Sequence, residues 1–200
     1  GGLMQAMFLR FFAPILCSSL LCPAQGQDLL SAAEPPFIPD SVLAGIHLCD
    51  AASAVVVIGA VPPDSLIDDR KDMPRVYFFN ADSTEILTAY FHYGDGQGAY
   101  SELRVTTAFS GPIRSGLPIK RFVSGRGIAL GMSEKEVRKI FGEPGHWGQR
   151  ADNSVDLTYS MRDPSALGYL QRCNSPVYYA RFSFSDEDRL IGYRFGFEYP

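Results

Sequence analysis

Three histidines, His47, His92 and His146, are the side chains of this sequence best suited to hold a metal ion or carry a proton. A zinc site takes ligands at short, regular spacing, whereas these histidines lie 45 and 54 residues apart. A glycine-rich run at 94–98 precedes an expected strand, although a phosphate-binding loop should open a helix. No serine stands in a Gly-x-Ser-x-Gly nucleophile motif. We therefore expect no catalytic residue, no metal site and no cofactor.

Cys49 and Cys173 are the two cysteines that follow an apolar N-terminal segment. In an oxidising compartment they could form a disulfide, and equally each could be a separate buried thiol, so the sequence leaves both readings open. Cys22 follows Ser19-Leu-Leu, which lacks the small residue usually found just before a lipidated cysteine. A lipid anchor is therefore disfavoured.

Arginine and tyrosine recur at positions that an alternating strand would turn to one side, and both are favoured at protein interfaces. Trp147 is a further candidate, because an exposed tryptophan could anchor a partner, whereas a buried one would only cover a sheet edge. We expect the double substitution Tyr179→Ala with Arg181→Ala to weaken binding and to leave the melting curve nearly unchanged. The candidate binding residues are Tyr90, His92, Arg104, Tyr179, Arg181, Arg194 and Trp147.

Alternating apolar and polar residues predict the strands that would present these side chains. Near the C-terminus Tyr193, Phe195 and Phe197 alternate with Arg194 and small residues, so one face is apolar and the other polar. This pattern is typical of an antiparallel sheet that is open to water on one side. The expected strands cover 75–80, 85–93, 100–107, 155–161, 176–184 and 189–198, with a further strand near 117–123.

A short segment that occurs twice predicts two helices, at 51–58 and 134–141. Each copy starts Gly-Ile-x-Leu, reaches an N-cap residue (Asp50 or Ser133) and stops at a glycine. Ser133-Glu-Lys-Glu136 is also a capping box. The matching apolar positions are Ala54, Val57 and Ile58 in the first copy and Val137, Ile140 and Phe141 in the second.

Helices this short, with one narrow apolar face, must lie on a sheet. The sequence therefore predicts an α+β fold in which a tandem repeat places short helices against antiparallel sheets. Repeat 1 is expected at 40–121 and repeat 2 at 122–200.

The N-terminal residues predict export. Residues 1–26 combine Arg10, an apolar run and a small-residue cleavage site, as a signal peptide does, and the proline-rich residues 27–39 are expected to form a flexible leader. The location is then periplasmic or secreted. A net charge of −4 argues against nucleic acid as partner, and no second apolar run could span a bilayer.

Gly131 to Pro144, which reads Gly-Met-Ser-x-x-Glu-Val-x-x-x-Phe-Gly-x-Pro, together with the Asp188-Arg-Leu turn, resembles a known superfamily. It comprises the SmpA/OmlA-like and β-lactamase-inhibitory-protein-like domains. The resemblance implies helices on one side of a curved antiparallel sheet whose open face recognises proteins. It covers the second copy well and the first weakly, where Cys49-Asp50 replaces Gly-Met-Ser.

Two classes of function remain open on sequence grounds. The preferred one is an exported, non-enzymatic protein-binding module, either an envelope scaffold or an inhibitor, that uses the open face of the sheet. The alternative is a periplasmic enzyme with dispersed acid–base residues. A pocket that gathers histidines and carboxylates with shifted pKa values would favour the enzyme, and a broad aromatic face would favour the binding module.

Overall fold

The computed structural model describes residues 37–61, 66–68, 73–92, 98–108, 116–162, 173 and 177–198. The expected signal peptide at 1–26, and the leader up to residue 36, lie outside the described residues.

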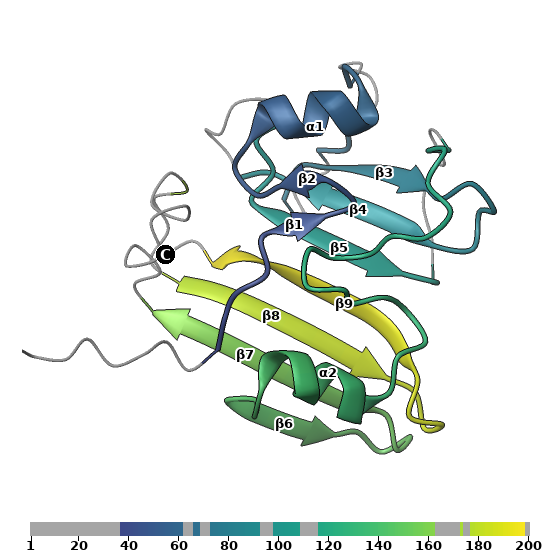
Figure 1. Ribbon diagram of the computed structural model, residues 1–200, viewed down its shortest axis with the longest axis vertical. Coiled ribbons are helices and arrows are strands. Elements are labelled where there is room, and N and C mark those ends of the chain that lie inside the picture. Colours follow the sequence, from purple (N-terminus) through teal and green to yellow (C-terminus); the bar gives the residue numbers. More distant parts are fainter. Residues whose placement is uncertain are drawn as a thin grey trace, which may run out of the picture. The chain divides into compact units, whose positions relative to one another are not determined.

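Seven strands form one antiparallel sheet in the order β3-β4-β5-β9-β8-β7-β6 (Figure 1). They are β3 (Arg75–Phe79), β4 (Ile86–Tyr90), β5 (Glu102–Thr106), β6 (His146–Gln149), β7 (Val155–Arg162), β8 (Val177–Phe184) and β9 (Leu190–Glu198). The helices are α1 (Ala51–Ile58) and α2 (Glu134–Phe141), and two short strands, β1 (Val42–Leu43) and β2 (Ile46–His47), form a separate ribbon. Six expected strands are thus present, and the strand expected near 117–123 is replaced by single bridges at Gly116 and Ser124.

The expected α+β tandem repeat is wrong: the described residues form far more strand than helix, and one sheet runs across the predicted boundary at 121/122. The join is the pairing of β5 with β9, in which Leu103 faces Phe195 and Val105 faces Tyr193. Two separate sheets would each leave an edge of unpaired backbone donors and acceptors. Pairing removes both edges and merges the two apolar faces into one core.

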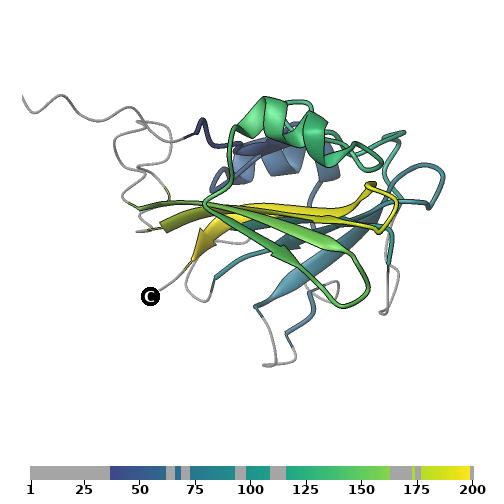
Figure 2. The ribbon, with the colours of Figure 1, turned by 90° about the horizontal axis from the view of Figure 1, so that it is seen from below.

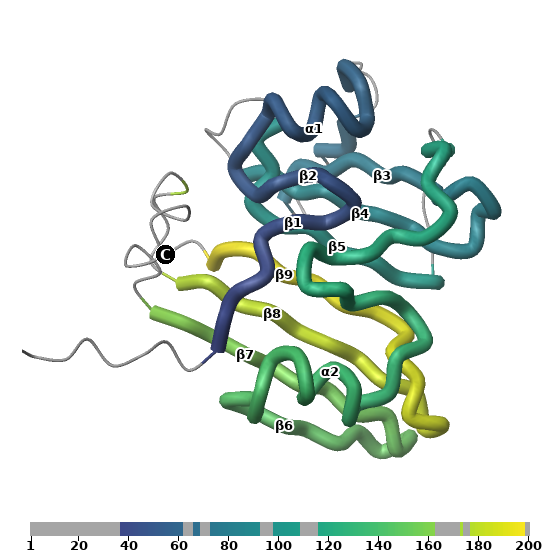
Figure 3. The backbone as a smooth tube through the Cα atoms, viewed as in Figure 1, coloured from purple at the N-terminus to yellow at the C-terminus, as the bar shows by residue number. Residues whose placement is uncertain are grey.

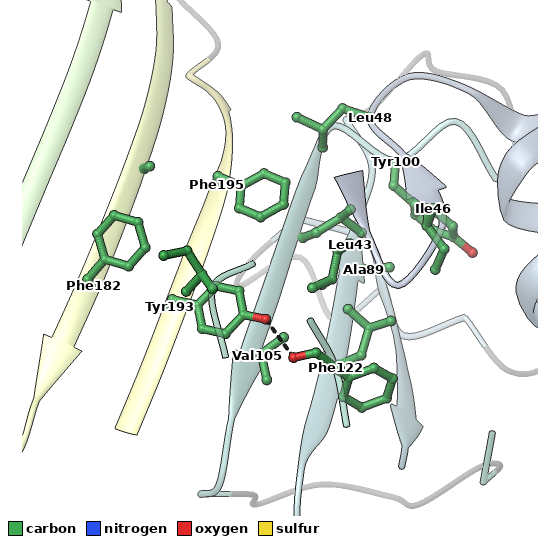
Figure 4. Close-up of a cluster of buried hydrophobic side chains, with 14 of the residues drawn as sticks. Leu43, Ile46, Leu48, Ala89, Tyr100, Val105, Phe122, Phe182, Tyr193 and Phe195 are labelled. Carbon is green, nitrogen blue, oxygen red and sulfur yellow. Dashed lines mark hydrogen bonds between the residues drawn. The ribbon is translucent and has the colours of Figure 1, made fainter. Parts of the chain in front are cut away.

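Both helices lie on the same face of the sheet, which we call the helix-bearing face (Figure 2). The core fills the space between this layer and the sheet. Figure 4 shows Tyr193 and Phe195 of β9 beside Val105 of β5, with Leu43 and Ile46 of the ribbon nearby. The Tyr193 hydroxyl also donates a hydrogen bond of 3.0 Å to the Phe122 carbonyl, which satisfies a polar group within the core.

Helix α2 begins and ends as predicted. The Ser133 hydroxyl accepts from the Glu136 backbone N–H, and the Glu136 carboxylate accepts from the Ser133 N–H, so the capping box is complete. Val137 and Phe141 are buried, and the Phe141 ring centroid lies 5.0 Å from that of Phe182. Ile140 is only half-buried at the side of this contact.

Helix α1 has the predicted bounds but buries less than predicted. Ala54 is buried, Val57 and Ile58 are half-buried, and Val56 is 85% exposed. The reason is that α1 packs on β2. Val57 lies against Gly45, so that a Cβ added at Gly45 would be 3.2 Å from the Cγ2 atom of Val57. The ribbon therefore stands between most of this helix and the sheet.

The expected flexible leader at 27–39 does not extend to its predicted end, because Phe37 is 7% exposed and belongs to the core. Its ring packs edge-on against Tyr159, with centroids 5.5 Å apart. Three residues later, the Asp40 backbone N–H donates to the Tyr178 hydroxyl, which in turn donates to the Asp40 carbonyl. Residues 37–40 are thus fixed to the helix-bearing face.

The segment from residue 116 to α2 runs over the same face, as the tube in Figure 3 shows. It is held at its start by a hydrogen bond of 2.7 Å from the Leu117 N–H to the Phe79 carbonyl at the outer edge of β3. Further on, the Phe122 N–H donates to the buried Glu85 carboxylate. The opposite face of the sheet carries no helix among the described elements, and it positions the candidate site.

Candidate interaction face

One residue from each of the seven strands lies in a single row across the face opposite the helices. Directly paired residues of an antiparallel sheet point to the same side, so the strand register alone defines this row. The row contains no carboxylate, and three adjacent strands at its centre each contribute an arginine. In sheet order the row reads Tyr77, Thr88, Arg104, Arg194, Arg181, Thr158 and His146.

We call Arg104, Arg194 and Arg181 the arginine row. Arg104 is exposed and forms no ion pair with any described carboxylate. Arg181 lies 2.9 Å from the carboxylate of the exposed Glu198, and Arg194 lies 3.5 Å from that of Glu102. The three guanidinium groups therefore differ in how far they are neutralised, with Arg104 the least.

The ring of Tyr179 supports two of these arginines. The Arg181 guanidinium lies 4.8 Å from the Tyr179 ring centroid and that of Arg194 lies 5.7 Å away. Tyr179 is 5% exposed, so both cations are held against a buried aromatic surface, which strengthens such contacts. This packing limits the rotamers of two side chains that would otherwise be free on an open sheet.

Glu102 is the buried charge of the site, with 2% of its surface exposed. Its carboxylate accepts a hydrogen bond from the Tyr179 hydroxyl and faces Arg194. Burial of the phenol raises the pKa of Tyr179, and the adjacent Glu102 carboxylate raises it further. The tyrosine therefore remains a neutral donor to Glu102 at physiological pH.

Gly196 makes the contact between Tyr179 and Glu102 sterically feasible. It is the direct partner of both Glu102 and Tyr179, between their two strands. An added Cβ at Gly196 would lie 2.4 Å from the Ser101 carbonyl oxygen and 2.7 Å from the Glu102 Cα. Without a side chain there, Tyr179 can reach across β9 to Glu102, and its ring replaces the contacts that glycine cannot make.

Of the candidate binding residues, the structure brings Arg104, Arg181 and Arg194 together, with Tyr179 beneath two of them. Tyr90 lies on the same face but is buried, with 5% exposed. His92 follows the end of β4, is buried, and places Nε2 3.3 Å from the Phe197 carbonyl. Neither Tyr90 nor His92 is thus available to a partner in this conformation.

Trp147 does not belong to the arginine row. It pairs with the buried Leu157, so it points to the helix-bearing face, at the edge of the sheet. It is 48% exposed, which makes the reading as a buried core residue wrong. Trp147 remains a separate exposed aromatic residue.

Glu102 and Glu198 are not among the candidate binding residues named from the sequence. Alternation puts Glu102 and Arg104 on the same side of one strand, but a single strand does not indicate which strand lies next to it. Only the β5–β9 pairing sets Glu102 opposite Gly196 and near Arg194. The signal that the sequence did contain was the pair of glycines flanking Arg194, which leave room around a central side chain.

Cys49 and Cys173 form a disulfide, with their Cα atoms 5.5 Å apart and a sequence separation of 124. Of the two readings left open by the sequence, the structure adopts the bonded one. Cys49 directly precedes the Asp50 cap, so the bond fixes the start of α1.

Comparisons with protein-family models, with curated proteins and with solved structures found no match. In the part of the chain that the structure describes, no helix is long and apolar enough to cross a membrane. The same residues contain no group of three or more histidine, cysteine or acidic side chains placed to hold a metal ion. The functional reading therefore rests on the geometry of the arginine row.

Proposed function

We propose that this chain is an exported, non-enzymatic protein-binding module that uses the face of the sheet opposite its helices. The observation that carries the proposal is the arginine row: three arginines on adjacent strands, two of them stacked on one buried tyrosine. Arginine supported by an aromatic ring is a typical interface anchor, because its guanidinium group binds strongly once water is excluded.

The rigidity of the support favours binding over a loosely solvated surface. Arg194 and Arg181 stand on β9 and β8, which are central strands of the sheet, with paired strands on both sides. Their positions are therefore fixed before a partner arrives, which lowers the entropy lost on association. An inhibitor and an envelope scaffold would both use such a prearranged surface.

Export is supported by two features of different kind. The first is the N-terminal combination of Arg10, an apolar run and a small-residue site. The second is the Cys49–Cys173 disulfide, since such bonds persist in oxidising compartments and are rare in the cytosol.

Affinity capture with matched variants tests the proposal. The chain from Gln27 onward, immobilised, is exposed to a native periplasmic or culture extract, in parallel with Arg104→Ala and Lys139→Ala. Lys139 is an exposed cation on α2, on the other face, so its removal changes the net charge equally. We expect Arg104→Ala to lose the captured protein and Lys139→Ala to retain it. Equal capture by both variants would show that this face is not the binding site.

A further inference from the structure

We propose that the arginine row recognises acidic side chains, so that the partner presents a segment carrying at least two aspartates or glutamates. This inference rests on the proposed function and specifies the chemistry of the partner.

Electrostatic repulsion within the row is the first reason. Like charges placed directly opposite one another on neighbouring strands destabilise a sheet. Here Arg104 faces Arg194 and Arg194 faces Arg181, which puts three cations on three consecutive strands. Glu102 and Glu198 offset part of this repulsion, and an arriving anion would offset the rest.

The ion pairs that already exist on this face support the same proposal. Glu102 is buried and already engaged by the Tyr179 hydroxyl, whereas Glu198 is exposed and, among the residues that the structure describes, forms an ion pair only with Arg181. Arg104 is exposed and forms no ion pair with any carboxylate of the described residues. A carboxylate from a partner could therefore bind Arg104 directly and compete with Glu198 for Arg181.

The spacing of the row fits an extended acidic segment. Neighbouring strands lie about 4.8 Å apart, so the outer two arginines stand roughly 10 Å apart at the backbone. In an extended chain, side chains on one side repeat every ~6.6 Å, a separation that the long arginine side chains can match. Two carboxylates two residues apart could thus each meet a guanidinium group, whose fork suits bidentate pairing.

A nucleic acid is the rival anion, and the molecule suits it less well. Nucleic-acid binding sites usually combine many cations over a wide basic surface. The whole chain has a net charge of −4, and this row holds only three arginines with two carboxylates beside it. A protein segment with a few acidic residues is the better match in charge.

Fluorescence anisotropy provides the test. The probes are a labelled peptide in which aspartate alternates with serine, the same peptide with asparagine in place of aspartate, and a single-stranded oligonucleotide of equal charge. Each is titrated with the chain from Gln27 onward and with Arg104→Ala and Lys139→Ala, all checked for unchanged melting curves.

We expect the aspartate peptide to bind about tenfold or more tightly than the asparagine peptide, and added salt to weaken it, because the contacts are charge-assisted. Arg104→Ala should weaken binding at least about fivefold, the effect of losing one charged hydrogen-bonding group, and Lys139→Ala should not. Equal binding of the two peptides, equal effects of the two substitutions, or tighter binding of the oligonucleotide would each overturn the inference.

The outcome separates this inference from the proposed function. If an extract protein is captured in an Arg104-dependent way while the aspartate peptide does not bind, the acidic chemistry is wrong and the binding face stands. If capture is independent of Arg104, both are wrong.

Discussion

At the scale of single residues, Tyr179 has two roles that the sequence did not separate. It was expected to be an exposed anchor, but it is buried, donates to Glu102 and supports two arginines. Strand alternation correctly placed it on the polar face. It could not reveal the burial, because that depends on Gly196 of a neighbouring strand. The arginines are the surface that a partner meets, and the tyrosine is what holds them.

The expectation that Tyr179→Ala together with Arg181→Ala leaves the melting curve nearly unchanged is therefore replaced by its opposite, because Tyr179 is buried. Removing a buried aromatic ring should cost about 3–5 kcal/mol. Tyr179→Phe keeps the ring beneath both arginines but leaves Glu102 without this donor, which should cost about 1–3 kcal/mol. Denaturant melts of the three chains measure this order, and a Tyr179→Ala chain as stable as the parent would contradict the burial.

Gly196 and Gly192 form a matched pair on the same face of β9. An added Cβ at Gly196 would meet backbone atoms at 2.4 and 2.7 Å, whereas one at Gly192 would come no nearer than 3.5 Å to the Val105 carbonyl. Gly196→Ala should therefore cost roughly 1–3 kcal/mol or more through overpacking. Gly192→Ala should be near neutral or stabilise by about 0.4–1 kcal/mol. Equal melting curves for the two variants would refute the close β5–β9 approach.

At the scale of elements, local signals predicted local structure well. The caps at Asp50 and Ser133 set both helix starts, and alternation found six of the seven sheet strands. The strand β6 was missed because His146–Gln149 is short and lacks alternation, and its pairing with β7 alone makes it a strand. The ribbon of β1 and β2 was missed for the same reason, since two residues carry no periodicity.

The capping box predicts a pH dependence of α2. Hydrogen bonds from the Ser133 backbone N–H, then from its hydroxyl, lower the pKa of Glu136 below its ordinary value of 4.5. A lowered pKa in the folded state contributes stability above the unfolded pKa that is lost as the pH falls through the folded pKa. The stability gap between the parent and Glu136→Gln should thus narrow as the pH falls below 4.5. Urea melts across this range measure the gap, and a constant gap would mean that the carboxylate is not held by the cap.

At the scale of the whole molecule, the sequence predicted the individual helices and most of the strands, but not the way the strands pair into one sheet. The segment that occurs twice, from Gly-Ile-x-Leu through a capped helix to a glycine, predicted two repeats, each with its own sheet. The pairing of β5 with β9 instead joins the seven strands into one sheet. Pairing between strands about 90 residues apart leaves no local trace in the sequence, so the register that builds the arginine row could not be derived from it.

The disulfide also acts at this scale, because it closes a loop of 124 residues. A loop of that length predicts a stabilisation of about 4–5 kcal/mol through restriction of the unfolded chain. Reductant should therefore lower the melting temperature of the parent chain. A chain with both Cys49→Ala and Cys173→Ala should have a lower melting temperature than the parent, and reductant should not change it. A parent chain indifferent to reductant would indicate that the bond is absent in solution.

The most direct test of the central claim is the affinity of a purified captured partner for three chains: the parent, Arg104→Glu and Lys139→Glu. Each substitution changes the net charge by the same amount, but only Arg104 belongs to the arginine row. Calorimetric titration should show Arg104→Glu binding at least about tenfold more weakly, a loss of ~1.4 kcal/mol, with Lys139→Glu close to the parent. Unchanged affinity for Arg104→Glu, or equal losses in both variants, would contradict the assignment of this face as the binding site.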